Sequence, residues 1–219
     1  MKIIADRICR RFSSSRGPVT ALDAVSLQIE AGGFVVIRGP SGSGKTTLLL
    51  ALGGMLRPSS GRVVAGGVDL YAMNSGARTR FRAEAIGFVF QMFHLVPYLS
   101  VLDNVKLGVR RGEAAHSVQA YALKTIERLR LGHRTHHKPA GLSTGERQRA
   151  ALARALIKRP RIILADEPTG NLDPQNASEV LDCLAEFHRG GGTVVVVTHG
   201  NAAAAEASQI VRLEEGRVV

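Results

Sequence analysis

Residues 39–46 have the clearest chemical signature in the sequence, Gly-Pro-Ser-Gly-Ser-Gly-Lys-Thr, which fits the spacing G-x-x-x-x-G-K-[ST]. Glycines in this pattern let successive backbone N–H groups turn toward one anion at the start of a helix. Lys45 adds an ammonium group for the β- and γ-phosphates, and the Thr46 hydroxyl is suited to bind Mg²⁺. The residues that we expect to bind the nucleotide phosphates are Gly39, Ser41, Gly42, Ser43, Gly44, Lys45, Thr46 and Thr47.

Two carboxylates follow a buried-strand pattern later in the chain. The apolar run at residues 162–165 ends in Asp166 and Glu167. At the tip of a core strand beside a triphosphate, one carboxylate can bind Mg²⁺ and a second can orient the attacking water. An apolar run followed by Asp is weak as an isolated signal. In a chain with a phosphate loop, the pair indicates phosphoryl-transfer chemistry.

A histidine follows a second strand of the same kind. The apolar run at residues 194–197 continues through Thr198 to His199. A histidine by itself is more often structural, but ligands of parallel α/β sheets collect at the carboxyl tips of the strands. We therefore expect His199 to lie in the same site as Asp166 and Glu167.

Two other polar segments allow more than one interpretation. Ser143 and Gly145 precede the alanine-rich helix expected at residues 150–156, so they could leave N–H groups for an anion or simply cap a core helix. The histidines at positions 133, 136 and 137 have a spacing that could bind a metal, but without acidic or cysteine partners at ligand spacing an ordinary polar loop is the favoured interpretation.

The apolar periodicity predicts the elements that position these residues. Strand patterns at residues 2–12 and 22–29 indicate a small β layer, and buried strands at 34–37, 161–166 and 194–198 indicate a mostly parallel core sheet. From Met92 to about Ala140 the pattern turns helical. We expect one α/β domain over residues 1–219, with a helical lobe inserted at about 92–145.

The composition narrows the class of protein. The chain has 219 residues and a formal net charge of +11, which suggests an anionic partner such as a nucleotide, nucleic acid or a membrane surface, although solvated basic faces explain scattered charges as well. No apolar run approaches the roughly 18 residues of a membrane span. Cys9 and Cys183 lie far apart without metal-type spacing. We therefore expect a cytoplasmic location.

In their order along the chain, these motifs resemble those of the ATP-binding-cassette (ABC) ATPases, and the resemblance covers essentially the whole sequence. The matching landmarks are the phosphate loop, Gln91 after Gly87–Phe90, the signature Leu142–Glu146, the pair Asp166-Glu167, the segment Asn171-Leu172-Asp173 and His199. The resemblance implies a P-loop α/β fold that binds ATP and Mg²⁺ and hydrolyses ATP.

The resemblance also implies a role for each landmark. Thr46, Gln91 and Asp166 would organise Mg²⁺, Glu167 would act as general base, and His199 would contact the γ-phosphate. Ser143 and Gly145 would reach ATP bound to a second copy of the chain, so that two copies sandwich two nucleotides head to tail. Asp173 would help to couple the two sites.

The sequence departs from the family pattern in two places. The signature reads Leu-Ser-Thr-Gly-Glu where Leu-Ser-Gly-Gly-Gln is usual, so Thr144 and Glu146 replace a glycine and a glutamine. Near the N-terminus, Phe12 stands where the family commonly stacks a tyrosine on adenine. Phe12 keeps an aromatic face but has no hydroxyl group.

More narrowly, residues 54–61, 90–97 and 167–173 resemble the branch of lipoprotein-releasing, macrolide-export and cell-division ATPases. That branch implies a separate integral membrane permease, met through residues 91–104, and a peripheral location on the inner face of the membrane. The apolar side chains at 93–99 are equally compatible with core packing. The alternatives are a soluble ABC ATPase acting on nucleic acid or ribosomes and a cell-division regulatory ATPase. We expect no specific nucleic-acid partner.

Overall fold

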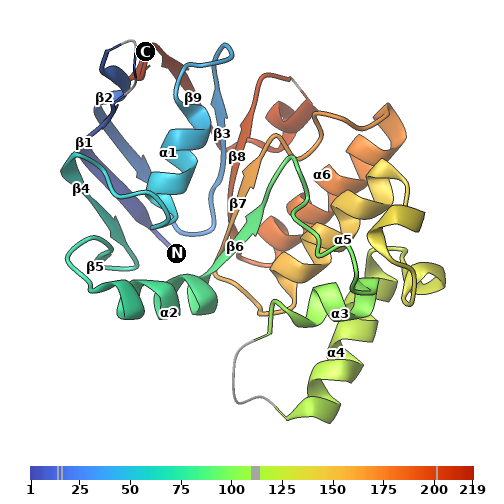
Figure 1. The fold of residues 1–219 in the computed structure, drawn as a ribbon. Coiled ribbons are helices and arrows are strands. Elements are labelled where there is room, and N and C mark those ends of the chain that lie inside the picture. The colour runs from blue at the N-terminus through green and yellow to red at the C-terminus, as the bar shows by residue number, and fades with distance from the viewer. Residues whose placement is uncertain (14, 16, 110–113, 201) are drawn as a thin grey trace.

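The computed structural model describes residues 1–13, 15, 17–109, 114–200 and 202–219. Within these residues, one sheet is antiparallel, with the strand order β2-β1-β4-β5 (Figure 1). Its strands are β1 (Ile3–Phe12), β2 (Val19–Ile29), β4 (Ser60–Ala65) and β5 (Val68–Asp69). This sheet is the small β layer that the alternating pattern predicts.

The second sheet is the mostly parallel core, with the order β10-β9-β3-β8-β7-β6 across the described chain. Its strands are β3 (Phe34–Arg38), β6 (Ile86–Val89), β7 (Ile162–Asp166), β8 (Thr193–Thr198), β9 (Gln209–Glu214) and β10 (Arg217–Val218). β10 is antiparallel to β9, and the other neighbours are parallel. Continuous apolar strands are typical of a parallel sheet covered on both faces.

Alternate residues of β3 belong to two hydrophobic cores. Val35 and Ile37 pack in the core that includes β1, β2 and the helix α1 (Lys45–Leu52). Phe34 and Val36 pack in the core formed with the helices on the opposite face. Because successive strand residues point to opposite faces, the sheet separates the two cores. Figure 1 shows α1 lying between the small β layer and the core sheet.

Helices lie on the other side of the core sheet (Figure 1). They are α3 (Val101–Lys106), α4 (Ala115–Arg128), α5 (Thr144–Leu156) and α6 (Pro174–Arg189), with the short 3₁₀ turns η1 (Gly132–Arg134), η2 (Pro139–Gly141) and η3 (Ala202–Glu206). Of these helices, α5 and α6 pack against the strands, and α3 and α4 pack against α5. The basic helix α2 (Ser75–Ala85) precedes β6, and the Asn74 side chain caps it by accepting from the N–H of Ala77. Parallel strands joined through helices give the predicted P-loop α/β fold.

The helical pattern predicted from Met92 is wrong for its first nine residues. Residues 92–100 form turns and irregular backbone, and α3 begins at Val101 after the N-cap Ser100. Phe93 and His94 have φ angles of 56° and 48°, which a right-handed helix does not allow. The expected lobe does contain α3 and α4, while residues 110–113 within it lie outside the described part of the chain.

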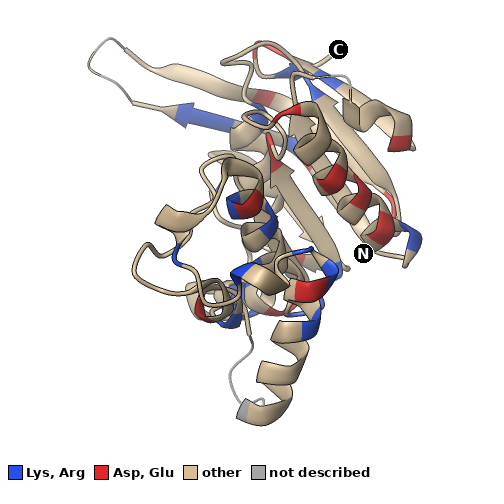
Figure 2. Ribbon diagram, turned by 90° about the vertical axis from the view of Figure 1, so that its right-hand side faces the viewer, with Lys and Arg blue, Asp and Glu red and all other residues tan. Residues whose placement is uncertain are grey.

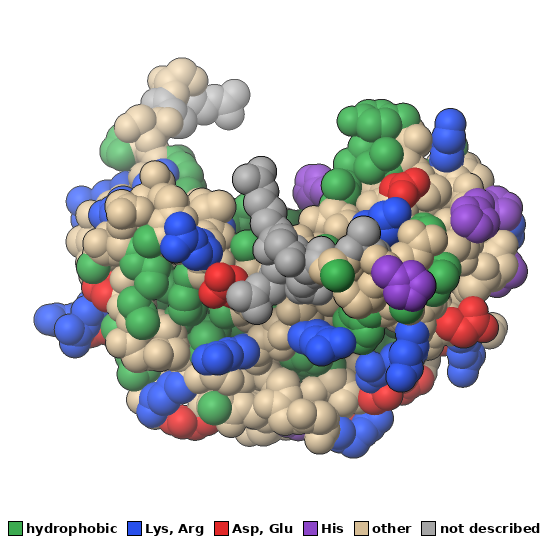
Figure 3. Space-filling view, turned by 90° about the horizontal axis from the view of Figure 1, so that it is seen from below, with side chains coloured by type: hydrophobic (Ala, Val, Ile, Leu, Met, Phe, Trp, Pro, Cys, Tyr) green, Lys and Arg blue, Asp and Glu red, His purple; other side chains and the backbone are tan. Residues whose placement is uncertain are grey.

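The basic charge is spread over the molecule. Figure 2 shows Lys and Arg distributed along both sheets and the helices, interleaved with Asp and Glu. On the face drawn in Figure 3, Lys and Arg side chains are likewise scattered among acidic ones. Such a distribution is typical of solvated faces. Of the helices that the structure describes, none combines the length and the hydrophobicity needed to cross a bilayer.

Candidate functional site

The phosphate loop joins the end of β3 to the start of α1 and is shaped by close backbone contacts. Gly44, the N-cap of α1, has a φ of 98°, and a Cβ atom there would collide with the carbonyl oxygen of Ala21. A Cβ atom on Gly39 would collide with the carbonyl oxygen of Leu213. Glycine is therefore required at position 44 for its conformational freedom as well as for its lack of a side chain, and at position 39 for its lack of a side chain. The N–H groups of the first turn of α1 are left for an anion.

Lys45 is folded back onto the phosphate loop itself. Its ammonium group donates to the carbonyl oxygens of Gly39 and Pro40, both at 2.8 Å. Ser43 is buried, and its Oγ has no hydrogen-bond partner in the described chain. The loop thus holds a cation and a free hydroxyl group beside backbone N–H groups. This combination suits an anion with several oxygens.

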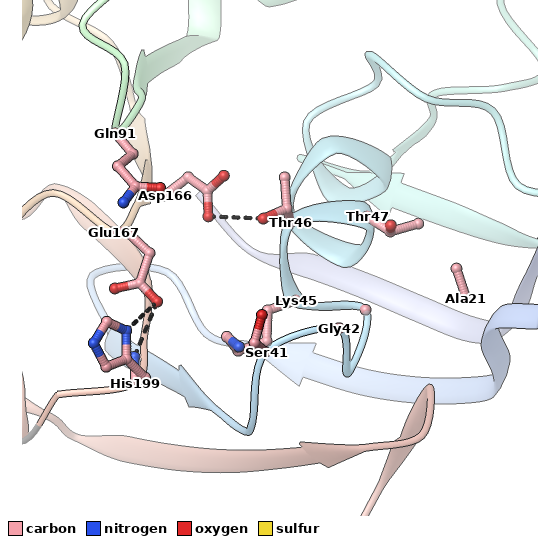
Figure 4. Close-up of a pocket in the computed structure, with 11 residues that line it drawn as sticks. Ala21, Ser41, Gly42, Lys45, Thr46, Thr47, Gln91, Asp166, Glu167 and His199 are labelled. Atoms are coloured by element: carbon pink, nitrogen blue, oxygen red, sulfur yellow. Dashed lines mark hydrogen bonds and ion pairs between the residues drawn. The ribbon is translucent and has the colours of Figure 1, made fainter. Parts of the chain in front are cut away.

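Thr46 connects the phosphate loop to the strand tip across from it. Its hydroxyl group donates to Asp166 Oδ1 at 3.0 Å (Figure 4). Burial raises the pKa of Asp166, the hydrogen bond from Thr46 opposes that rise, and the neighbouring charge of Glu167 adds to it. A cation bound at this carboxylate would favour its ionised form. The hydroxyl and carboxylate oxygens that meet here are hard ligands of the kind that Mg²⁺ prefers.

Glu167 is held in a left-handed backbone conformation, with a φ of 45°. Its carboxylate accepts hydrogen bonds from the backbone N–H of His199 at 3.1 Å and from the Thr198 hydroxyl at 3.1 Å, and it lies 2.9 Å from His199 Nδ1. Such a conformation costs a non-glycine residue roughly 1–3 kcal/mol, and residues held in this way cluster at functional sites. The strand tips of β7 and β8 therefore fix Glu167 and His199 as a pair.

The predicted residues converge on one cavity of about 590 Å³. It is lined by Ala21, Ser41, Gly42, Gly44, Lys45, Thr46, Thr47, Gln91, Asp166, Glu167 and His199. Figure 4 shows the phosphate loop on one side of this cavity and Gln91, Glu167 and His199 on the other. Ala21 was not foreseen, because its place in the lining depends on how β2 packs against the phosphate loop. No local motif signals that contact.

Some predicted residues lie outside the lining of this cavity. Two of them, Gly39 and Ser43, belong to the phosphate loop but do not line the cavity. Others lie at the starts of α5 and α6, namely Ser143, Gly145 and Asp173. Phe12 ends β1, where it is 37% exposed, and the guanidinium of Arg10 lies 4.5 Å from the centre of its ring. The stacking of Phe12 on adenine stays a prediction.

Ser143 and Glu146 form a reciprocal capping box at the start of α5. Ser143 Oγ accepts from the N–H of Glu146 at 3.2 Å, and Glu146 Oε2 accepts from the N–H of Ser143 at 2.8 Å. Glu146 also accepts from Arg134 at 2.8 Å. The unusual glutamate of the signature therefore stabilises the start of this helix. Two of the histidines lie beside this capping box. His133 contacts Glu146, and His137 contacts Arg134. Among the described residues, no cluster of His, Cys, Asp or Glu side chains is arranged to hold a metal ion.

Replacing Glu146 with Gln is expected to lower the free energy of unfolding by about 1 kcal/mol, because the ion pair with Arg134 is lost while an amide oxygen still caps Ser143. Burial acts to raise the pKa of Glu146, but the hydrogen bonds from Ser143 and Arg134 outweigh it and hold the pKa below its usual value. Such a carboxylate stabilises the fold above its unfolded pKa, and this contribution is lost as the pH falls through the folded pKa. Urea unfolding of the parent and the variant should show the difference in their free energies of unfolding at pH 7, and that difference should shrink below about pH 4. An equal difference at both pH values would contradict the assignment.

Arg154 of α5 anchors the segment that follows Gln91. Its guanidinium donates to the carbonyl oxygens of Phe93, at 2.7 Å, and His94. These are the two residues with positive φ angles. The Phe90 ring stacks on Phe88 and meets the His94 ring edge-on. The backbone just beyond Gln91 is thereby fixed against the helix that begins with the signature.

Comparison with known proteins identifies the family. The family model described as ABC transporter matches residues 22–170, which is more than half of the chain. The chain belongs to the ABC transporter family. It is an ATPase domain of that family, as its motifs predict, and the ABC ATPases bind ATP.

Individual relatives place this ABC cassette more closely. It is 42% identical over 218 residues to the lipoprotein-releasing system ATP-binding protein LolD of Geobacter metallireducens, covering 97% of this chain and 95% of that protein. It is 42% identical over 214 residues to the macrolide export ATP-binding/permease protein MacB of Burkholderia pseudomallei, covering 97% of this chain and 33% of that protein. The chain thus spans about a third of the length of the MacB proteins that it matches. These relatives confirm the predicted likeness to lipoprotein-releasing and macrolide-export ATPases.

A solved structure confirms the fold. The cassette of MJ0796, described as a dimeric post-hydrolysis state bound to ADP and Pi, superposes with a TM-score of 0.93 at 36% identity, covering 99% of this chain and 96% of that one. The predicted α/β P-loop fold of an ABC cassette is therefore correct over essentially the whole molecule.

Proposed function

We propose that this chain binds and hydrolyses Mg²⁺-ATP as the ATPase subunit of a membrane complex for export, lipoprotein release or the transmission of mechanical work. The observation that carries this proposal is the cavity in which the phosphate loop faces Asp166, Glu167 and His199. The likeness to LolD along nearly the full length of both proteins supports it.

The phosphate loop is expected to exchange internal hydrogen bonds for contacts with the nucleotide. Lys45 leaves the carbonyl oxygens of Gly39 and Pro40, which hold it at 2.8 Å, and turns to the β- and γ-phosphates. The Ser43 hydroxyl, which has no partner among the described residues, and the loop N–H groups are available to phosphate oxygens. Ser41 and Thr47 line the same cavity.

Three side chains fit a resident Mg²⁺ ion. Thr46 and Asp166 are already in hydrogen-bond contact, and Gln91 lines the cavity beside them. Their hydroxyl, carboxylate and amide oxygens are hard ligands that match the preference of Mg²⁺. When bound, the ion would neutralise charge on the phosphate oxygens. By holding the ion, the three residues would help to keep the triphosphate in the cavity that Glu167 also lines.

Glu167 is the proposed general base. Its carboxylate is half of a pair with His199, whose Nδ1 lies 2.9 Å away, and only 14% of the Glu167 side chain is exposed. A carboxylate fixed at a strand tip can accept a proton from water that attacks the γ-phosphate. The His199 side chain is 69% exposed at the cavity rim, from where it can contact the same phosphate.

A second copy of the chain would complete each site. Ser143, Gly145 and Asp173 do not line the cavity with Lys45, which agrees with a role toward nucleotide on another copy. The MJ0796 cassette is described as dimeric. We propose that two copies bind head to tail, each giving its phosphate loop to one ATP and its signature to the other.

An integral membrane permease is the other proposed partner, and it would place the chain on the inner face of the membrane. LolD is named as part of a lipoprotein-releasing system, and MacB is named as an ATP-binding/permease protein. Met92 and Tyr98, in the segment predicted to meet the permease, are 72% and 73% exposed. Exposed apolar side chains of this kind are available to a partner. The soluble nucleic-acid or ribosome ATPase and the cell-division regulator are not favoured.

Mass spectrometry of co-purified proteins tests this assignment. Tagged Glu167→Gln chain would be isolated in Mg²⁺-ATP from detergent-solubilised membranes of the source cell, with the Lys45→Ala chain as the matched control. A membrane protein in stoichiometric amount with the first variant and reduced with the second is expected. Recovery of ribosomal or nucleic-acid-binding proteins in its place would contradict the membrane assignment.

A further inference from the structure

Asn176, in the first turn of α6, contacts both the signature Leu142–Glu146 and the segment that ends in Asp173. Its Nδ2 donates to Asp173 Oδ2 at 2.6 Å, and its Oδ1 accepts from Arg149 Nη1 at 2.6 Å. Arg149 lies on α5, one turn beyond Gly145. Because an arginine can only donate and a carboxylate only accepts, these partners fix the orientation of the Asn176 amide.

The Asn176 side chain also lies directly against Gly145. A Cβ atom built on Gly145 would collide with Oδ1, Cγ and Cβ of Asn176. The close approach of α5 and α6 at this point therefore depends on the absence of a side chain at position 145. Asn176 is in contact with one signature residue and hydrogen-bonded to Asp173, so this one side chain touches both segments.

The remaining contacts of this junction do not depend on the Asn176 side chain. Asp173 Oδ1 caps α6 by accepting from the backbone N–H of residue 176 at 3.0 Å, which any residue there provides. Arg149 keeps a second acceptor, Glu179 Oε2, at 2.6 Å. Removal of the Asn176 amide would leave both the N-cap and the Arg149–Glu179 ion pair in place. The Arg149–Glu179 ion pair holds α6 to α5 without the Asn176 amide. What the amide itself does is to align Asp173 with the signature.

We propose that Asn176 is a positioning residue that holds Asp173 and the signature of one chain in the register that a second copy requires. This inference rests on the head-to-tail dimer proposed above. Asn176 does not line the cavity around Lys45, so its effect should fall on association of the two copies and not on nucleotide binding by each. A group held by a supporting contact loses its alignment when that contact is removed.

Sedimentation equilibrium of the dimer tests the proposal. In the Glu167→Gln background, Asn176→Ala is expected to weaken Mg²⁺-ATP-dependent dimerisation at least tenfold. The affinity of the chain for a fluorescent ATP analogue, titrated at protein concentrations where it is monomeric, should change less than twofold. The matched control is Gln175→Ala, which shortens an exposed neighbour in the same helical turn and should leave both quantities unchanged.

The outcomes separate the inference from the proposed function. If Glu167→Gln dimerises with ATP and Asn176→Ala dimerises equally well, the inference alone is wrong. If Asn176→Ala lowers nucleotide affinity and thermal stability together with dimerisation, its role is merely structural and the inference is again wrong. If the Glu167→Gln chain does not dimerise with ATP at all, the proposed head-to-tail pair fails, and the positioning role fails with it.

Discussion

The Glu167→Gln variant should hydrolyse Mg²⁺-ATP about 10²–10⁴-fold more slowly than the parent chain, because an amide cannot accept the proton of the attacking water. That loss corresponds to roughly 3–5 kcal/mol of transition-state stabilisation. ATP binding should persist, since the phosphate loop lies on the opposite side of the cavity (Figure 4). Phosphate release under saturating Mg²⁺-ATP measures the rate, and titration with a fluorescent nucleotide measures binding.

Glu215→Gln is the matched control for this variant. Glu215 is exposed, has a φ of 48° close to the 45° of Glu167, and is outside the cavity lining. The control makes the same change of charge in the same backbone conformation, so its hydrolysis rate should equal that of the parent. A Glu167→Gln chain that hydrolyses ATP at the parental rate would show that Glu167 is not the base.

The Lys45→Ala variant should lose most of its affinity for ATP. Lys45 is the cation of the phosphate loop, and charge-assisted contacts of one ammonium group with two phosphates contribute about 3 kcal/mol, which is roughly a hundredfold in affinity. The glycine contacts that shape the loop involve backbone atoms of residues 21 and 213, so the loop should keep its conformation. Titration with a fluorescent ATP analogue measures the change.

Lys124→Ala controls for the loss of one positive charge. Lys124 is exposed on α4 and does not line the cavity, so its removal should leave ATP affinity within twofold of the parent. Thermal unfolding of both variants checks that they are folded. Undiminished ATP affinity in a folded Lys45→Ala chain would refute the assignment of the phosphate loop.

The parts of the site that sequence patterns could predict are those whose determinants are local. The phosphate loop needs glycines, a lysine and a threonine within eight residues, and the strands that carry Asp166 and His199 are continuous apolar runs. Parallel strands end at the same edge of a sheet, so the sequence alone predicts that these two strand tips meet the phosphate loop.

The capping role of Glu146 was also readable from the sequence, although it was not recognised. A serine followed three residues later by glutamate is the signature of a capping box, and Ser143 and Glu146 have that spacing. The structure shows that its carboxylate caps the N–H of Ser143.

Other features depend on contacts between distant segments, which no local pattern encodes. The backbone of Phe93 and His94, whose φ angles are positive, is held by bonds from Arg154, sixty residues along the chain, to their carbonyl oxygens. The place of Ala21 in the cavity and the bond between Arg149 and Asn176 arise in the same way. Hydrophobic periodicity predicts which side of a helix or strand is buried, whereas these contacts depend on how the helices and strands pack together.

The central claim is that each active site takes residues from two copies of the chain. Its most direct test is the specific rate of Mg²⁺-ATP hydrolysis, measured over protein concentrations at which sedimentation velocity shows the passage from monomer to dimer. We predict that the rate per chain rises in step with the dimer fraction and levels off when dimerisation is complete. A rate per chain that is the same in the monomer as in the dimer would contradict the claim, because it would mean that one copy is sufficient for catalysis.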